Sequence, residues 1–140
     1  MFNIDVSTRE YGDHVVVALR GELDLADAAS VAAALMAVAD NVPDVIVDLA
    51  ALEFIDSSGV AALAYGRRQA RRAGGNLMLA APQQQVLKVL SLTRLADAFS
   101  VHASVDEATG SAGHSQPAAV PVPSRHTKIL QTTLAVTALR

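Results

Sequence analysis

A short polar segment, Asp56-Ser57-Ser58-Gly59, carries the side chains of this 140-residue chain with the clearest potential for chemistry. It lies between a predicted strand and a predicted helix, so both hydroxyls are expected at or near a helix N-terminus. The first N–H groups of a helix lack internal partners and the dipole is positive there, so a phosphate on Ser57 could be accommodated. That phosphate would add nearly two negative charges beside Asp56 and repel a partner packed on this surface.

The same segment also suits a purely structural role. Asp and Ser are among the residues preferred at the N-cap of a helix, where a side-chain oxygen accepts a bond from a backbone amide. Taken alone, the tetrapeptide favours a cap over a switch, because short motifs often match by chance.

Catalytic and metal chemistry have less support. The chain contains no G-x-x-x-x-G-K-S/T, G-x-G-x-x-G or G-x-S-x-G motif, and no histidine is near the serines in sequence. The fold could still bring His14 or His102 to Ser57, so serine-hydrolase chemistry is disfavoured rather than excluded. With no cysteine, and with His14, His102, His114 and His126 scattered, we expect no metal and no other cofactor.

Composition narrows the possible partners and compartments. The net charge of −3 and the pI near 5.7 disfavour direct contact with nucleic acid or an anionic membrane, which would require a basic surface. The N-terminus does not resemble a secretion signal, and no apolar run is long enough to span a membrane. We therefore expect a cytoplasmic protein that contacts neither nucleic acid nor membrane.

The elements that must position the serines alternate between strands and helices. The apolar patterns predict a β-hairpin (2–6 and 14–21), a helix (24–40), a central parallel strand (44–49) and, after a loop through Leu52 and Phe54, a second helix (60–73). A strand (76–80), a third helix opened by Pro82, a short strand (99–101) and a helical stretch (104–108) follow. This order predicts a single α/β domain with a mixed, largely parallel sheet of four to five strands covered by about four helices.

The domain is expected to end near residue 109. Residues 110–124 are rich in Pro, Gly and Ser and are predicted to form a linker. The tail, residues 125–140, regains apolar residues, and its structure and role stay open.

Two further segments accompany the serines. Gly21-Glu22-Leu23-Asp24 follows the second predicted strand, and Val45-Ile46-Val47-Asp48-Leu49 precedes the serine turn. Together with the stretch from Leu52 to Val60, these segments resemble the STAS family in order and spacing. The resemblance implies that Ser57 is the phosphorylated serine, with Ser58 a less favoured acceptor.

The family resemblance also implies a function. The chain would be an anti-sigma factor antagonist, not an enzyme, that binds an anti-sigma factor/serine kinase when unphosphorylated and releases it when phosphorylated. Such partner switching regulates transcription in bacterial signalling, including stress responses. ATP and magnesium would belong to the kinase, and a phosphatase would restore the serine. The expected partner-binding residues are Glu22, Asp24, Asp56, Ser57, Ser58 and Gly59.

Several alternatives stay open. A STAS accessory module that binds a transporter ATPase or another signalling complex would use the same surface, and a monomer or weak dimer is compatible with the sequence. Glu22 and Asp24 could contact the partner or cap a helix. Phe54 and Tyr65 are expected to pack, and a solvated helix end is favoured over a landing site for the arginines at positions 67, 68, 71 and 72.

Overall fold

The computed structural model describes residues 4–42 and 44–111. Within them one sheet has the strand order β1-β2-β3-β4-β5, with β1 and β2 antiparallel and the other neighbours parallel. Five strands and four α-helices confirm the predicted α/β class. In chain order the elements are β1 (Ile4–Tyr11), β2 (His14–Leu23), α1 (Leu25–Asn41), β3 (Asp44–Ile55), α2 (Ser57–Arg72), β4 (Asn76–Ala80), α3 (Gln84–Ser91), the 3-10 helix η1 (Arg94–Ala98), β5 (Val101–His102) and α4 (Val105–Ser111).

The predicted hairpin is present, with a longer first strand than expected. β1 continues to Tyr11, which pairs with His14 across a tight turn. Gly12 supplies the positive φ of 66° that this turn needs. Residues 2 and 3 of the predicted strand lie outside the described residues.

The strand before the serine segment is also longer, and the predicted loop through Leu52 and Phe54 is wrong. β3 runs on to Ile55, because the C-terminal end of β2 continues to pair with it up to Leu23 and Ile55. Irregularities in the pairing near Gly21, which has a φ of 106°, accommodate this extension. The apolar alternation expected of a strand is disturbed there, so the sequence pattern resembles a loop.

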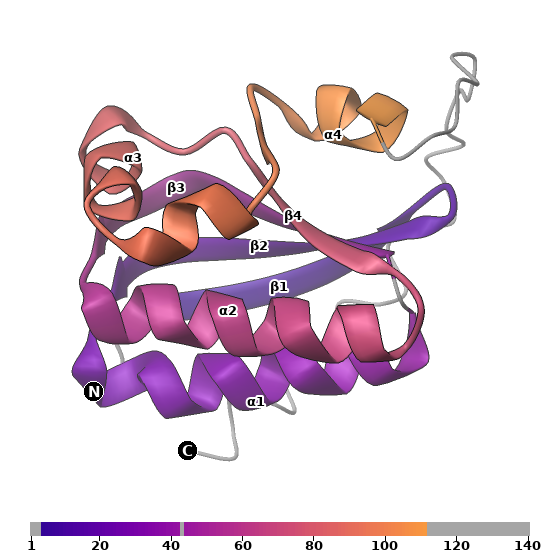
Figure 1. Ribbon diagram of the computed structural model, residues 1–140, viewed down its shortest axis with the longest axis horizontal. Helices are drawn as coiled ribbons and strands as arrows, with labels where there is room; N and C mark the ends of the chain where they lie inside the picture. The colour runs from indigo at the N-terminus through magenta and orange to yellow at the C-terminus, as the bar shows by residue number, and fades with distance from the viewer. Residues whose placement is uncertain (1–3, 43, 112–140) are drawn as a thin grey trace.

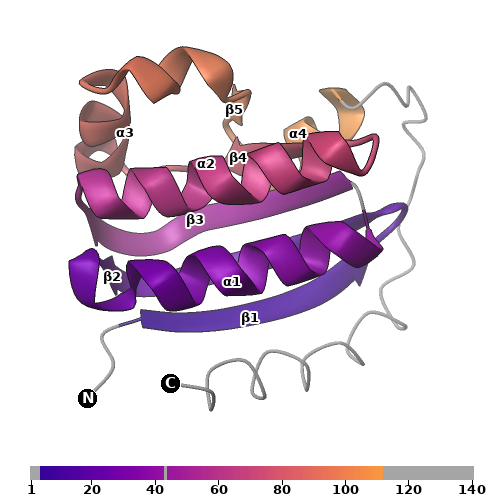
Figure 2. The same cartoon turned by 60° about the horizontal axis from the view of Figure 1, so that its bottom comes forward.

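Helices α1 and α2 lie side by side on one face of the sheet (Figures 1 and 2). Their contact is close: a Cβ on Gly66 of α2 would lie 2.8 Å from the Cβ of Leu35 of α1. The main core fills the space between these helices and the sheet, with fully buried side chains such as Leu19, Val47 and Leu63. The N-termini of both helices are therefore at the same end of the molecule.

The opposite face of the sheet carries a smaller core under α4. Ala108 packs there with Val16, Ile46 and Met78. The phenol of Tyr11 donates a hydrogen bond to the carboxylate of Asp106, which ties α4 to the first strand.

Three boundaries in the last third differ from the predictions. The third helix begins at Gln84 rather than at Pro82, with Gln83 as its N-cap. The last strand is Val101–His102, because Phe99 turns into the core and is 7% exposed. The last helix extends to Ser111, three residues beyond the predicted helical stretch. The predicted domain end near residue 109 stays a prediction, because the linker and tail beyond residue 111 lie outside the described residues. No helix in the described part of the chain has the length and apolar character needed to cross a membrane.

Candidate functional site

The serine segment forms the start of α2, which begins at Ser57, three residues before the predicted start at Val60. The reason is Asp56, whose extended backbone and side chain make it the N-cap: its Oδ1 accepts a hydrogen bond from the Gly59 amide at 3.0 Å. The cap predicted as the structural alternative is thus present, and Asp56 provides it.

Asp56 also connects the two helix starts. Its Oδ2 accepts a hydrogen bond from the Leu25 amide, the first residue of α1, at 3.2 Å. Its own backbone amide donates to the carbonyl of Leu23 at 3.2 Å. The turn before α1 and the turn before α2 are therefore held together by one aspartate.

Asp24 is the N-cap of α1. Its Oδ1 accepts from the Ala26 amide at 3.0 Å, and its carbonyl accepts from the amides of Asp27 and Ala28. Of the two carboxylates that could cap or contact a partner, Asp24 thus has the capping role. Glu22 is exposed near the end of β2 and pairs across the sheet with Phe54, so it is free to face a partner.

Gly59 is required by close packing. A Cβ at this position would lie 2.6 Å from Cγ1 of Ile55, 2.8 Å from Cγ of Leu23 and 2.9 Å from the carbonyl oxygen of Leu23. These distances are too short for any side chain. The first turn of α2 is therefore pressed against the ends of β2 and β3, and the buried Val60 anchors it there.

Ser57 points into solvent from this fixed turn. It is exposed, whereas Ser58 is partly buried, and neither hydroxyl has a hydrogen bond to another described residue. As the first two residues of the helix, both keep backbone amides without intrahelical acceptors. The exposure favours Ser57 over Ser58 as the more accessible acceptor.

Exposed apolar side chains border the serine segment. Leu25, whose amide is bonded to Asp56, is 74% exposed, and Phe54, two residues before Asp56, is 46% exposed. Phe54, expected to pack near the site, therefore keeps about half of its side chain exposed. Leu25 was not among the residues predicted to bind a partner, although a leucine directly after a capping aspartate could have indicated it.

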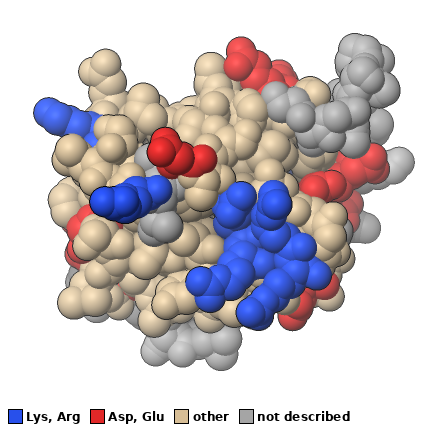
Figure 3. Space-filling model, in the orientation of Figure 1, with Lys and Arg blue, Asp and Glu red and all other residues tan. Residues whose placement is uncertain are grey.

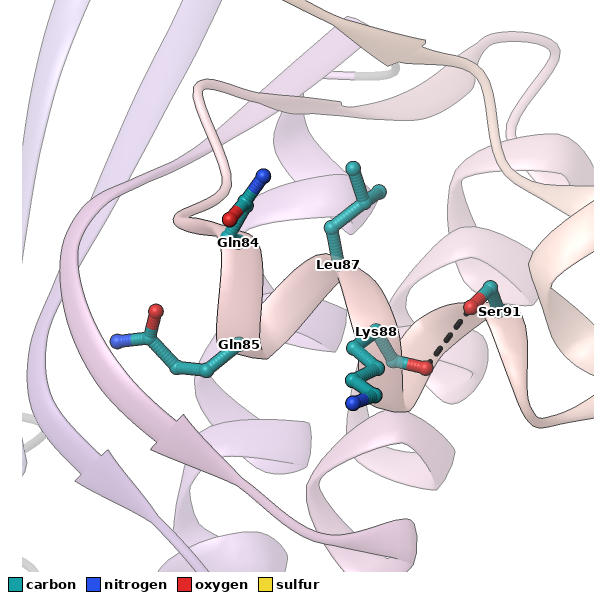
Figure 4. A pocket seen from close by; sticks show the side chains of 5 residues that line it. All are labelled: Gln84, Gln85, Leu87, Lys88 and Ser91. Carbon is teal, nitrogen blue, oxygen red and sulfur yellow. Dashed lines mark hydrogen bonds between the residues drawn. The ribbon is translucent and has the colours of Figure 1, made fainter.

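A shallow hollow lies along α3. It is lined by one face of that helix: Gln84, Gln85, Leu87, Lys88 and Ser91, as Figure 4 shows. Gln85 donates to the carbonyl of Glu53 at 3.2 Å, which holds the start of α3 against the end of β3. Because a single helix lines it, the hollow is an open contact surface.

Neither His14 nor His102 lies close enough to Ser57 to form a catalytic pair with it. His14 begins β2, about 30 Å along the strand from Leu23 at the site. Nε2 of His102 lies 3.0 Å from Oγ of Ser100, which is in another part of the fold. The structure therefore brings no described histidine into a serine-histidine pair with Ser57.

A family profile described as STAS domain matches residues 5–108 of the sequence, which is most of the described fold. The chain belongs to the STAS domain family. No curated protein sequence is a significant match.

Solved structures support the assignment of this STAS domain. An anti-sigma factor antagonist from Mycobacterium paratuberculosis has 27% identity and a TM-score of 0.71, with 79% of this chain and 95% of that chain covered. SpoIIAA, an anti-sigma factor antagonist, in its unphosphorylated form has 26% identity and a TM-score of 0.61, with 74% and 94% covered. The murine anion transporter Slc26a9 shares the fold alone, at 17% identity and a TM-score of 0.66, with 78% and 22% covered.

Proposed function

We propose that this STAS domain is an anti-sigma factor antagonist that binds an anti-sigma factor/serine kinase while Ser57 is unphosphorylated. Phosphorylation of Ser57 releases the partner, and a phosphatase reverses the change. The observation that carries the proposal is the exposed Ser57 on a first helical turn that Asp56 and Gly59 hold rigid. The similar structures named as anti-sigma factor antagonists support the same function.

The proposed switch acts through surface charge with little change of fold. Ser57 projects from the helix, so a phosphate there needs no rearrangement of the buried Val60 or of the capping bonds. The unpaired first amides of α2 can face the phosphate. A partner packed on Leu25 and Phe54 would instead meet a hydrated dianion next to Asp56.

The partner surface in this proposal combines apolar contacts with carboxylates. Glu22, Asp24, Asp56, Ser57, Ser58 and Gly59 are the residues expected from the sequence, and Leu25 and Phe54 add exposed apolar area. In this arrangement Asp24, Asp56 and Gly59 act mainly by positioning the surface. Glu22, Ser57 and the apolar pair would touch the partner.

The direct test is binding of purified variants to the anti-sigma kinases encoded in the same genome. Ser57→Ala should bind with wild-type affinity and resist phosphorylation, whereas Ser57→Asp should bind more weakly. Ser58→Ala is the matched control and should still be phosphorylated. Equal binding by Ser57→Ala and Ser57→Asp would contradict the charge mechanism.

The alternative expected from the sequence is an accessory module bound to a transporter ATPase or another signalling complex. Affinity capture from the host with intact-mass measurement separates the two functions. A phosphate on Ser57 together with a captured ATP-dependent kinase supports the antagonist. An unmodified serine with transporter subunits supports the accessory module.

In this role the protein has no enzymatic activity and acts in the cytoplasm. A nucleophilic Ser57 would be trapped by a fluorophosphonate probe. We expect no labelling of Ser57, and labelling that disappears in Ser57→Ala would contradict the assignment.

A further inference from the structure

Four arginines crowd the C-terminal half of α2: Arg67, Arg68, Arg71 and Arg72. They form one continuous basic patch, seen in blue in Figure 3, which we call the α2 arginine patch. The whole chain carries 14 acidic and 11 basic residues, so this concentration of positive charge contrasts with the remaining surface. None of the four guanidinium groups forms an ion pair with a carboxylate of the described residues.

The close spacing of the four arginines lowers the stability of α2. Arg67 and Arg71, like Arg68 and Arg72, are four residues apart, and like charges at this spacing repel and destabilise a helix. The helix dipole offsets this effect only in the last turn, where Arg71 and Arg72 lie. In addition, Nε of Arg67 is buried without a hydrogen-bond acceptor among the described residues. An anionic partner would relieve the repulsion.

An aromatic side chain adjoins the α2 arginine patch. Tyr65, expected to pack, is 49% exposed, and the guanidinium carbon of Arg68 lies 5.7 Å from the centre of its ring. This contact holds Arg68 over the ring. Exposed tyrosine and arginine together are the residue types that contribute most at protein interfaces.

The size of the patch and the excess of acidic residues in the chain favour an acidic protein segment over nucleic acid or an anionic membrane. The patch occupies six residues of helix, about 9 Å of its axis, which suits a short acidic segment. Nucleic acid or an anionic bilayer would extend past the patch onto a domain in which acidic residues outnumber basic ones, and would be repelled there.

The patch and Ser57 are at opposite ends of α2. Arg67, the nearest of the four arginines, is ten residues from Ser57, which is about 15 Å along the helix axis and roughly two Debye lengths at physiological ionic strength. A phosphate on Ser57 is therefore screened from the arginines. We infer that the α2 arginine patch with Tyr65 is a second docking surface, for an acidic segment of a protein partner, that stays available whether or not Ser57 is phosphorylated.

The test measures binding of a fluorescein-labelled decapeptide of alternating Glu and Ala to the full chain, with the Gln/Ala decapeptide as the neutral probe. Saturable binding at 50 mM salt that weakens steeply by 300 mM is expected for the acidic peptide only. The variant Arg68→Gln/Arg72→Gln should raise the Kd about fivefold, because it removes two exposed ion pairs that each contribute modestly to binding.

The matched control is Arg20→Gln/Arg94→Gln, which removes the same charge from two exposed arginines elsewhere. At physiological ionic strength, where a charge at Ser57 is screened from the patch, the control and Ser57→Asp should both bind within twofold of wild type. Four results would overturn the inference: no saturable binding of the acidic peptide, equal weakening by the control, weakening by Ser57→Asp, or binding of a 20-nucleotide DNA or of phosphatidylserine vesicles through the same arginines at least as tightly.

Discussion

The carboxylate of Asp56 accepts a hydrogen bond from the amide of Leu25, 31 residues earlier in the chain. The same side chain caps α2 through Gly59, so it serves two helix starts at once. A displacement of the first turn of α2 would therefore strain or break the hydrogen bond to the start of α1. This relationship makes the two turns one rigid surface around the exposed Ser57.

Asp56→Ala should destabilise the domain more than Asp24→Ala. Loss of an N-cap costs about 0.5–2 kcal/mol, and Asp56 supplies one cap and a second bond to α1, whereas Asp24 caps α1 alone. Urea unfolding followed by circular dichroism measures both variants. An equal or smaller loss for Asp56→Ala would show that the bond to Leu25 contributes nothing.

Gly59→Ala should lower the free energy of unfolding by about 1–3 kcal/mol, because the added methyl would overlap Ile55 and the backbone of Leu23. The control is Gly110→Ala in α4, where a Cβ would meet no atom within 4 Å and the helix propensity of alanine favours a small gain. Thermal melting distinguishes the two. Equal stability of both variants would refute the close approach of α2 to the strand ends.

If the proposed function holds, Leu25→Gln should weaken binding to the proposed anti-sigma partner while leaving the melting temperature nearly unchanged. Leu25 is 74% exposed in the free domain, and burying a leucine side chain contributes about 1.5–3 kcal/mol, which corresponds to at least a tenfold change in Kd. Met36→Gln is the control, because Met36 is another exposed apolar residue of α1, about three turns along the helix from Leu25. Titration calorimetry measures the Kd of both variants for the partner. A higher Kd for Leu25→Gln alone shows that the partner contacts the surface around Ser57, and equal Kd values would contradict this.

The attachment of α4 should weaken at alkaline pH. The hydrogen bond to Asp106, followed by burial and the negative charge of that carboxylate, raises the pKa of Tyr11. The neutral phenol is therefore favoured in the folded state. Its contribution to stability is complete below the unfolded pKa of about 10 and is lost as the pH rises through the higher folded value.

Melting between pH 8 and pH 11 measures this effect, with Tyr11→Phe as the variant that lacks the titrating group. The wild type should lose more stability over this range than Tyr11→Phe does. Asp106→Asn should lower the pKa of Tyr11 in an absorbance titration. Identical pH profiles for the wild type and Tyr11→Phe would contradict the assigned hydrogen bond.

Local patterns in the sequence were sufficient for much of the fold. Secondary structure could be predicted for three segments from residues that are neighbours in sequence or one helical turn apart. These segments are the β-branched run at 14–21, the alanine-rich helix after Asp24 and the strand at 44–49 between two aspartates. The tetrapeptide at 56–59, placed before a helix, likewise indicated the cap, whereas the choice of Ser57 as acceptor came from the resemblance to the STAS family. Each of these conclusions depends on short-range periodicity and on the chemistry of single side chains.

Tertiary structure alone decided the features that depend on distant residues. β3 extends through Leu52 because β2 is beside it, and Gly59 is required because Leu23 is pressed against it. Asp56 reaches Leu25, and Leu25 and Tyr65 stay exposed, only once the two helices lie side by side. Local propensity does not encode these contacts, since pairing and burial arise from chain segments brought together by the packing of the whole sheet.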